Sequence, residues 1–172
     1  TIDVEEADVI IVNTCGFIDS SKQESINKII EMGQLNKVLI VCGCLVQRYK
    51  EELEKAIPEV DLFISIDEYE EFWEKIANLI NKDIKSKNTL DYLDRVISTG
   101  NTTAYLKIGE GCSNNCTYCA IPYIRGPFVS RKMEEILEEA KILTERGIKE
   151  LIVIAQDTTK YGVDIYGESK LA

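Results

Sequence analysis

The sequence contains no histidine and little positive charge. Its 172 residues include 20 Lys and Arg against 30 Asp and Glu, which gives a formal net charge of −10. Without histidine, the zinc sites that pair Cys with His cannot form. The acidic balance repels a phosphate backbone, so direct nucleic-acid binding is not favoured, whereas a basic protein partner is.

Long apolar runs are also missing. No stretch approaches the roughly 20 residues of a membrane-spanning helix, and no apolar signal segment opens the chain. A disulfide framework is typical of small secreted domains, and nothing in the sequence indicates secretion. We therefore expect a cytoplasmic protein with no membrane partner. With 172 residues, 45% of them hydrophobic, the chain can form one large or two small domains.

Three of the six cysteines lie in one short run. Cys112, Cys116 and Cys119 are separated by three residues and then by two. This spacing wraps a loop around one point, so three thiolates can bind three irons of an iron-sulfur cube and leave the fourth iron open to a cosubstrate. The alternatives are structural zinc, a disulfide or three unrelated thiols. We favour the cluster, because helices, strands and cores have no reason to produce this spacing.

Strands and helices alternate along the N-terminal half. The expected elements are strands at residues 8–13, 37–42 and 60–65, and helices after Ser20 or Ser21, at residues 45–57 and after Asp67. Helical spacing predicts that Ile26, Ile29, Ile30 and Gly33 line the inner face of the first helix. The alternation predicts a parallel sheet covered on both faces, in an α/β domain of residues 1–80.

The C-terminal half has the pattern of a second unit. Residues 81–101 lack a sustained period and are predicted to be an interdomain linker, so this unit covers residues 102–172. The expected elements are a strand at residues 103–108, a helix capped by Ser130, with Ile136, Ala140 and Leu143 inside and Gly147 at its end, and a buried strand at residues 150–155. They form a parallel βαβ unit in which the cysteine loop follows the first strand, where (β/α) barrels place active sites.

The N-terminal half carries cysteines of its own. Cys15 and Cys44 each follow the C-terminal end of a predicted parallel strand, so both emerge at the sheet edge where α/β proteins bind ligands. We expect Cys42 to be buried, as free cysteines often are. Two thiolates do not complete a cluster site, and two core cysteines remain the alternative.

Taken together, these motifs resemble those of the methylthiotransferases, a family of radical S-adenosylmethionine (SAM) enzymes. The resemblance is carried by residues 13–15, 43–44, 111–119 and 121–131, and it covers the whole chain. Residues 44–49, 58–61 and 155–164 are most similar to the RimO branch, which modifies a ribosomal protein. The related tRNA-modifying branch, MiaB, usually has Asn at the position of Asp157.

The resemblance implies a fold and a set of cofactors. The fold is a parallel-sheet methylthiotransferase domain followed by the first βαβ part of a radical SAM partial TIM barrel. The cofactors are SAM and two 4Fe-4S clusters, one held by Cys112, Cys116 and Cys119 and an auxiliary one with Cys15 and Cys44 among its ligands. Family members begin before Thr1, where another auxiliary ligand lies, and continue past Ala172, so we expect an internal part of a longer protein.

The resemblance also implies a reaction. A SAM-derived radical removes hydrogen from the β-carbon of an aspartate in the small-subunit ribosomal protein uS12, and a methylthio group is inserted there. No amino-acid side chain can homolyse such a C–H bond, so the cofactor is necessary. The reaction needs a low-potential electron donor and a sulfur source. Two other functions stay open, a tRNA adenosine methylthiotransferase and a non-enzymatic iron-sulfur electron-transfer protein.

Four further residues are predicted to lie near SAM. Tyr118 directly precedes the third cysteine of the motif, with simple loop packing as the alternative. Arg125 and Arg131 carry guanidinium groups that suit the SAM carboxylate, although each arginine can instead be solvated. Gln156 falls at the C-terminal end of the second barrel strand, where polar residues tend to line a site.

Overall fold

The computed structural model describes residues 3–84 and 92–171 and divides into two compact units, Thr1–Leu90 and Asp91–Ala172. The predicted linker falls partly on residues 85–91, and that part of the prediction lies outside the described residues. Across the described ranges, no helix is both long and apolar enough to cross a membrane.

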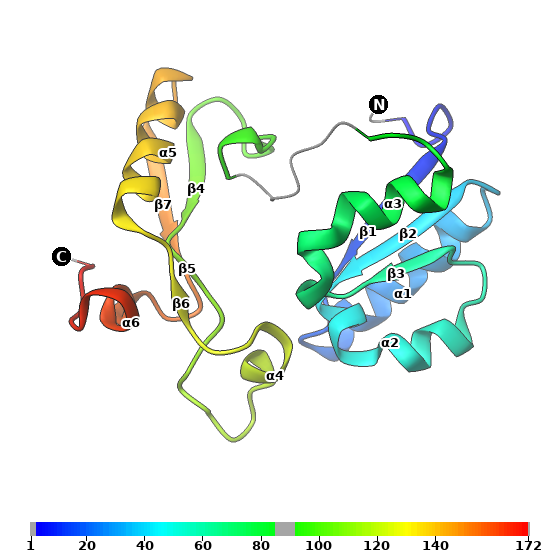
Figure 1. The fold of residues 1–172 in the computed structure, drawn as a ribbon, viewed down its shortest axis with the longest axis horizontal. Coiled ribbons are helices and arrows are strands. Elements are labelled where there is room, and N and C mark those ends of the chain that lie inside the picture. The colour runs from blue at the N-terminus through cyan, green and yellow to red at the C-terminus, as the bar shows by residue number, and fades with distance from the viewer. Residues whose placement is uncertain (1–2, 85–91, 172) are drawn as a thin grey trace. The chain divides into compact units, whose positions relative to one another are not determined.

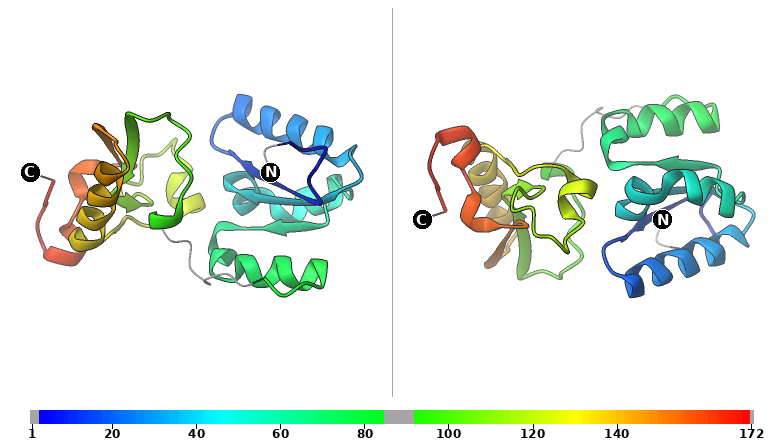
Figure 2. Two further views of the ribbon diagram at one scale, coloured as in Figure 1. Left: turned by 90° about the horizontal axis from the view of Figure 1, so that it is seen from above. Right: turned by 90° about the horizontal axis from the view of Figure 1, so that it is seen from below.

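The N-terminal unit is a three-stranded parallel sheet in the order β1-β2-β3 (Figure 1). Its elements are β1 (Val9–Thr14), α1 (Asp19–Gly33), β2 (Val38–Gly43), α2 (Cys44–Ala56), β3 (Leu62–Ile64), the 3-10 helix η1 (Ile66–Glu71) and α3 (Phe72–Ile80). Helices α1 and α2 pack on one face, and α3 lies on the opposite face from α1 (Figure 2). The predicted parallel sheet with two covered faces is confirmed.

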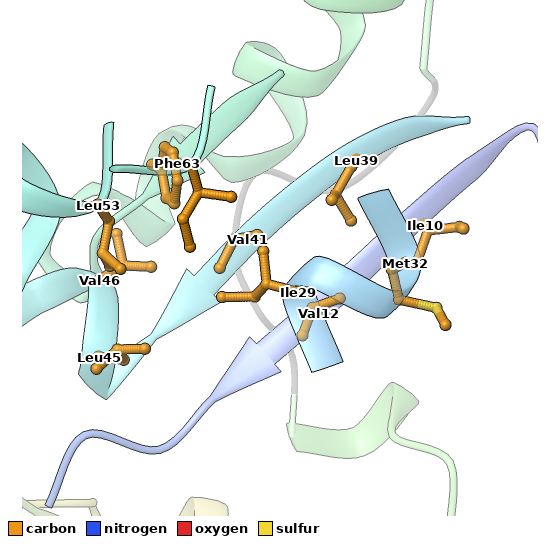
Figure 3. Close-up of a cluster of buried hydrophobic side chains, with 11 residues drawn as sticks. Ile10, Val12, Ile29, Met32, Leu39, Val41, Leu45, Val46, Leu53 and Phe63 are labelled. Carbon is orange, nitrogen blue, oxygen red and sulfur yellow. The ribbon is translucent and has the colours of Figure 1, made fainter. Parts of the chain in front are cut away.

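Both faces of this sheet are apolar because β2 is apolar along its whole length. Side chains alternate across a strand, so Leu39 and Val41 join the cluster beneath α1 and α2 (Figure 3). Ile40 and Cys42 point the other way and pack with Phe72 of α3. Cys42 is 4% exposed, which confirms the prediction that it is buried.

The details of α1 differ from the prediction. The helix begins at Asp19 after Ile18, and no side chain caps it, so the predicted cap at Ser20 or Ser21 is wrong. Ile29 and Met32 form the buried stripe, whereas Ile30 is 49% exposed. One residue advances a helix by about 100°, which turns Ile30 away from the face that Ile29 occupies.

The segment before α3 also begins earlier than predicted. Ser65, rather than Asp67, stands at the start of η1, and its backbone N–H donates to Glu68 Oε2 at 2.8 Å. Lys50 and Lys75 both pair with Glu68 at 2.6 Å. Burial raises the pKa of Glu68, but the hydrogen bonds from Lys50, Lys75 and Ser65 outweigh it and hold this pKa well below its usual range.

The C-terminal unit is built on two parallel strands and their crossover helix. Its elements are η2 (Tyr92–Asp94), β4 (Thr103–Lys107), β5 (Gly109–Glu110), α4 (Ile121–Arg125), β6 (Val129–Ser130), α5 (Met133–Glu145), β7 (Glu150–Ile154), η3 (Thr158–Lys160) and α6 (Val163–Tyr166). β4 pairs with β7 in parallel, and α5 crosses between them, as predicted. The antiparallel ribbon β5-β6 was not predicted, and it brackets the cysteine loop.

Two further predictions for α5 fare differently. Gly147 follows the helix with a φ of +94°, in the left-handed region expected at that position. Ser130 is not the cap, since α5 begins at Met133. Its hydroxyl instead donates to Asp164 Oδ1 at 2.5 Å and accepts from the N–H of Gly162 at 2.9 Å. Serine often caps a helix, but the Ser130 hydroxyl is used here for tertiary hydrogen bonds.

Strand β7 is less covered than predicted. Ile152, Val153 and Ile154 are between 37% and 44% exposed. Within the described residues, β4 is the one strand hydrogen-bonded to β7, and the unit's core lies toward α5. The sequence of β7 is apolar like that of a buried strand, but only Leu151 and the following Ala155 pack against this core, while Ile152, Val153 and Ile154 stay exposed.

Candidate iron-sulfur sites

Cys15 and Cys44 leave the sheet from neighbouring strand ends. The β1–β2 register pairs Thr14 with Gly43, and each cysteine is the next residue. Gly43 has a φ of +104°, and a Cβ on it would lie 2.5 Å from the carbonyl oxygen of Thr14. A Cβ on Gly16 would lie 2.7 Å from Leu45 Cα. The two cysteine-bearing segments therefore touch through their backbones, as the parallel topology predicts.

Side chains from both flanking helices hold the Cys15 segment. Ser25 of α1 accepts from the Cys15 N–H at 3.1 Å and donates to the Cys15 carbonyl oxygen at 3.2 Å. Arg48 of α2 donates to the Gly16 carbonyl oxygen at 3.3 Å. Cys15 is exposed while Cys44 is 8% exposed, and neither is in a disulfide.

The second candidate site is the loop between β5 and α4, which contains Cys112, Cys116 and Cys119. The N–H of Cys119 donates to the carbonyl oxygen of Cys116 at 2.9 Å, which closes a β-turn and keeps their Cα atoms within about 7 Å. The N–H of Cys112 donates to the carbonyl oxygen of Gly126 at 3.1 Å. Tyr118, inside the turn, is 91% exposed.

The thiols do not form a ready metal site. Within residues 3–84 and 92–171, no three His, Cys, Asp or Glu side chains are grouped so that they could hold a metal ion. The donor set of Cys112, Cys116 and Cys119 nevertheless suits an iron-sulfur cluster, because all three donors are thiols and two belong to one tight turn. A cluster bound there would have to draw the three thiols together, which would couple its binding to local folding.

The cysteine loop is tied to the C-terminal end of β7. Asn114 Nδ2 donates to Asp157 Oδ2 at 2.7 Å, and the other oxygen of Asp157 accepts from the N–H and hydroxyl of Thr159. Hydrogen bonds from Thr159 and Asn114 lower the pKa of Asp157, so the carboxylate stays ionised. Gln156, the neighbouring predicted SAM residue, is exposed at the same strand end.

Arg125 lies at the base of this loop. Its guanidinium pairs with Glu110 Oε1 at 2.8 Å, and Lys107 pairs with the other oxygen of Glu110. Burial raises the pKa of Glu110, but hydrogen bonds from Lys107 and Arg125 more than offset this and lower it overall. In the structure, Arg125 therefore joins α4 to β5 at the two ends of the loop.

Arg131, another predicted SAM residue, lies in an internal ion pair. Its side chain is 9% exposed and pairs at 2.6 Å with Glu139, which is 2% exposed. Arg131 also donates to the carbonyl oxygen of Lys107 and lies 3.7 Å from the ring centroid of Tyr92. The guanidinium of Arg131 is thus engaged by a buried carboxylate on α5 rather than solvated, and its place near SAM stays a prediction.

Some residues that shape the two sites were not predicted. Ser25 and Asn114 are polar residues whose partners lie 10 and 43 residues away, so no local pattern reveals them. Glu139 lies on the buried stripe of α5, three residues from Ile136. An ionisable residue at such a position signals a buried partner, and this signal was available in the sequence.

Comparison with known proteins identifies the class of each half. The family model described as Radical SAM superfamily matches residues 106–172, and the model described as Uncharacterized protein family UPF0004 matches residues 1–65. The chain thus combines a UPF0004 domain with radical SAM sequence, in the order that the two structural units follow.

Individual relatives narrow this class. The chain is 64% identical to "Ribosomal protein uS12 methylthiotransferase RimO" of Alkaliphilus oremlandii over 171 residues. This alignment covers 97% of the chain and 39% of the relative. The proteins of the same name from Clostridioides difficile and Acetivibrio thermocellus are 55% and 53% identical, each over 99% of this chain and over 41% and 42% of their own lengths. Nearly the whole chain is therefore similar to proteins named as methylthiotransferases, and its C-terminal part matches the radical SAM superfamily. The chain spans about two fifths of the length of these curated relatives.

Proposed function

We propose that the protein containing this chain is a RimO-type methylthiotransferase, which adds a methylthio group to the β-carbon of an aspartate of ribosomal protein uS12. One observation carries the proposal: a chain 64% identical to a protein of that name has the cysteine loop in one unit and two cysteines at neighbouring strand ends in the other. Residues 1–80 then form the auxiliary-cluster domain, and residues 102–172 begin the radical SAM domain. Because ribosomes are the substrate's location, the reaction belongs to the cytoplasm.

In this proposal Cys112, Cys116 and Cys119 hold three irons of the SAM-binding 4Fe-4S cluster. When bound, the cluster and SAM supply a radical that can remove hydrogen from an unactivated carbon. The Cys116–Cys119 turn keeps these two cysteines close together, and the Asn114–Asp157 hydrogen bond holds that loop against the end of β7.

We assign Tyr118, Arg125 and Gln156 to the vicinity of SAM. Tyr118 and Gln156 are exposed beside the loop and at the end of β7, where a bound cosubstrate can meet them. Arg125 keeps a cation at the loop's base, next to the carboxylate of Glu110, and so offsets negative charge there. A SAM carboxylate that enters this region finds a guanidinium already oriented by an ion pair.

Cys15 and Cys44 are proposed as two ligands of the auxiliary 4Fe-4S cluster. Their shared sheet edge and the exposure of Cys15 leave room for a cluster beside the strand ends. The reaction also requires a sulfur source and a low-potential electron donor. With a net charge of −10, the chain is suited to a basic protein substrate rather than to bare nucleic acid.

The deciding experiment is mass spectrometry of uS12 and of tRNA nucleosides from cells with and without the intact gene. We expect uS12 to gain one methylthio group on an aspartate only when the gene is present. Loss of a methylthio nucleoside from tRNA, with uS12 unchanged, would instead assign the protein to the tRNA-modifying branch. A reduced cluster whose EPR spectrum does not respond to added SAM would indicate an electron-transfer protein.

A further inference from the structure

We propose that Ser25 is a positioning residue that sets the backbone of Cys15 for the auxiliary cluster. This inference rests on the proposed function, because it concerns a ligand of that cluster. A hydroxyl can donate and accept at once, and Ser25 uses both capacities on one residue. It accepts from the Cys15 N–H at 3.1 Å and donates to the Cys15 carbonyl oxygen at 3.2 Å.

Cys15 needs such support because it lies past the end of the strand ladder. Thr14 is the last residue of β1 that pairs with β2, and its hydroxyl donates to the carbonyl oxygen of Cys42 at 2.7 Å. Beyond Thr14 the sheet no longer holds the chain. Ser25 then bonds to both backbone polar groups of Cys15, and Arg48 bonds to the carbonyl oxygen of Gly16. The ligand segment is therefore held from α1 and from α2.

This arrangement separates the backbone of Cys15 from its thiol. The N–H and carbonyl oxygen are occupied by Ser25, while the residue as a whole is exposed. A thiolate on a fixed backbone loses less freedom when iron binds, which favours retention of the metal. The Cys15 N–H is also kept from bonding to a cluster sulfur, and hydrogen bonds of that kind change the electronic properties of a cluster.

The test uses the intact enzyme with Cys112, Cys116 and Cys119 all changed to Ala, so that the auxiliary cluster is the one remaining. Ser25→Ala should make this cluster lose iron to a chelator about 10-fold faster, as expected for loss of a residue that orients a metal ligand. Its EPR spectrum should also change. Ser25→Thr keeps the hydroxyl and should restore both properties, and Ser20→Ala, at an exposed serine of the same helix, should change neither.

Each remaining outcome also decides the matter. Equal iron loss and identical EPR spectra for Ser25→Ala and its parent overturn the inference and leave the proposed function intact. If the triple Cys→Ala enzyme with Ser25 intact binds no iron, both the inference and the proposed auxiliary cluster are overturned. If Ser25→Ala fails to fold by circular dichroism, Arg48→Gln replaces it, because this change removes the bond to Gly16 from the other helix and should accelerate iron loss by a smaller factor.

Discussion

In both cysteine sites a glycine with a positive φ directly precedes a cysteine, but the two sites differ in the contacts that hold the cysteine segment. Gly43 precedes Cys44, and Gly111 precedes Cys112. Their φ angles are +104° and +70°, and a Cβ on either would lie within 2.5 Å of a backbone carbonyl oxygen, that of Thr14 or of Pro127. In both units, a glycine lets the backbone of a neighbouring segment come close to a cysteine.

Beyond that glycine the support differs. The N-terminal cysteines directly follow two paired strands of a sheet that has apolar clusters on both faces. The C-terminal loop lies between the strands of the short ribbon β5-β6 and is held by side-chain hydrogen bonds of Asn114, Arg125 and Ser113. The first pair of cysteines therefore rests on paired strands, whereas the second set rests on side-chain hydrogen bonds of its own loop.

The largest expected effect comes from removing one ligand at each site of the intact enzyme. Cys116→Ala should abolish SAM cleavage and leave the auxiliary cluster in place. Cys44→Ala should remove the auxiliary cluster and leave SAM cleavage in place. Each variant should retain roughly half of the iron, because the proposed function uses two clusters of equal size. Iron analysis and measurement of 5′-deoxyadenosine check this. Loss of both clusters in either variant would show that the two sites depend on each other.

A buried charge distinguishes the C-terminal unit from the apolar N-terminal one. Arg131→Gln removes one of the two arginines that pair with the buried Glu139, and Arg95 remains at 3.1 Å, so we expect this change to destabilise the unit by about 1.5 to 3 kcal/mol. Thermal unfolding of the intact enzyme measures the loss. Lys141→Gln, at an exposed position of the same helix, is the matched control and should have little effect. Unchanged stability together with weakened SAM binding would show that Arg131 acts at the SAM site instead.

The shared glycine device can be broken in one unit at a time. Gly111→Ala should impair loading of the SAM-binding cluster, and Gly43→Ala should impair the auxiliary one, each with about 2 to 3 kcal/mol of backbone strain and steric overlap. Gly147→Ala is the control, because Gly147 also has a positive φ but nothing lies within 4 Å of an added Cβ. Equal damage from all three changes would mean that φ alone, and not the close approach, matters.

The hydrogen bond between the loop and β7 should have a smaller effect. Asn114→Ala removes the 2.7 Å bond to Asp157, and we expect a cost of about 1 kcal/mol at this exposed position. The SAM-binding cluster should then lose iron faster, by iron-release kinetics, whereas the auxiliary cluster should not respond. Thr117→Ala, at another exposed loop position, is the control. A response from both clusters would contradict a local role.

The smallest expected effect is a pH dependence at the base of the loop. The pKa of Glu110 is lowered in the folded protein, so its ion pairs contribute full stability above its ordinary pKa of 4.5, and that contribution disappears as the pH falls through the lower folded value. The free energy of unfolding of the C-terminal unit should therefore decrease as the pH falls below 4.5. Glu110→Gln should flatten the dependence, and the exposed Glu134→Gln should not.

Features with a local or periodic signal were predictable from the sequence. The burial tendency of free cysteine was enough to predict that Cys42 is buried, and the alternation of strands and helices was enough to place Cys15 and Cys44 at one sheet edge. The βαβ unit followed from the inner stripe of α5. The position of the three cysteines in one loop after a strand was also predictable from their spacing along the chain.

Features that depend on distant polar contacts were not predictable. Ser130 has the chemistry of a helix cap, but Asp164, 34 residues further on, binds it instead. The inner stripe of α5 signals that Glu139 has a buried partner, but only the tertiary fold shows that its partners are Arg95 and Arg131. A residue's type gives its capacity for hydrogen bonds, whereas the tertiary fold selects which partner it meets.

The burial of Cys42 has a consequence for chemical labelling. Desolvation raises the pKa of its thiol, and Phe72 and Ile76 cover it, so alkylating reagents should react with it slowly while the protein is folded. Cys15 and Cys116 are exposed in the same chain. Cys42 therefore offers an internal standard: its modification reports global unfolding, against which the protection of the exposed cysteines by bound iron can be quantified in a single sample.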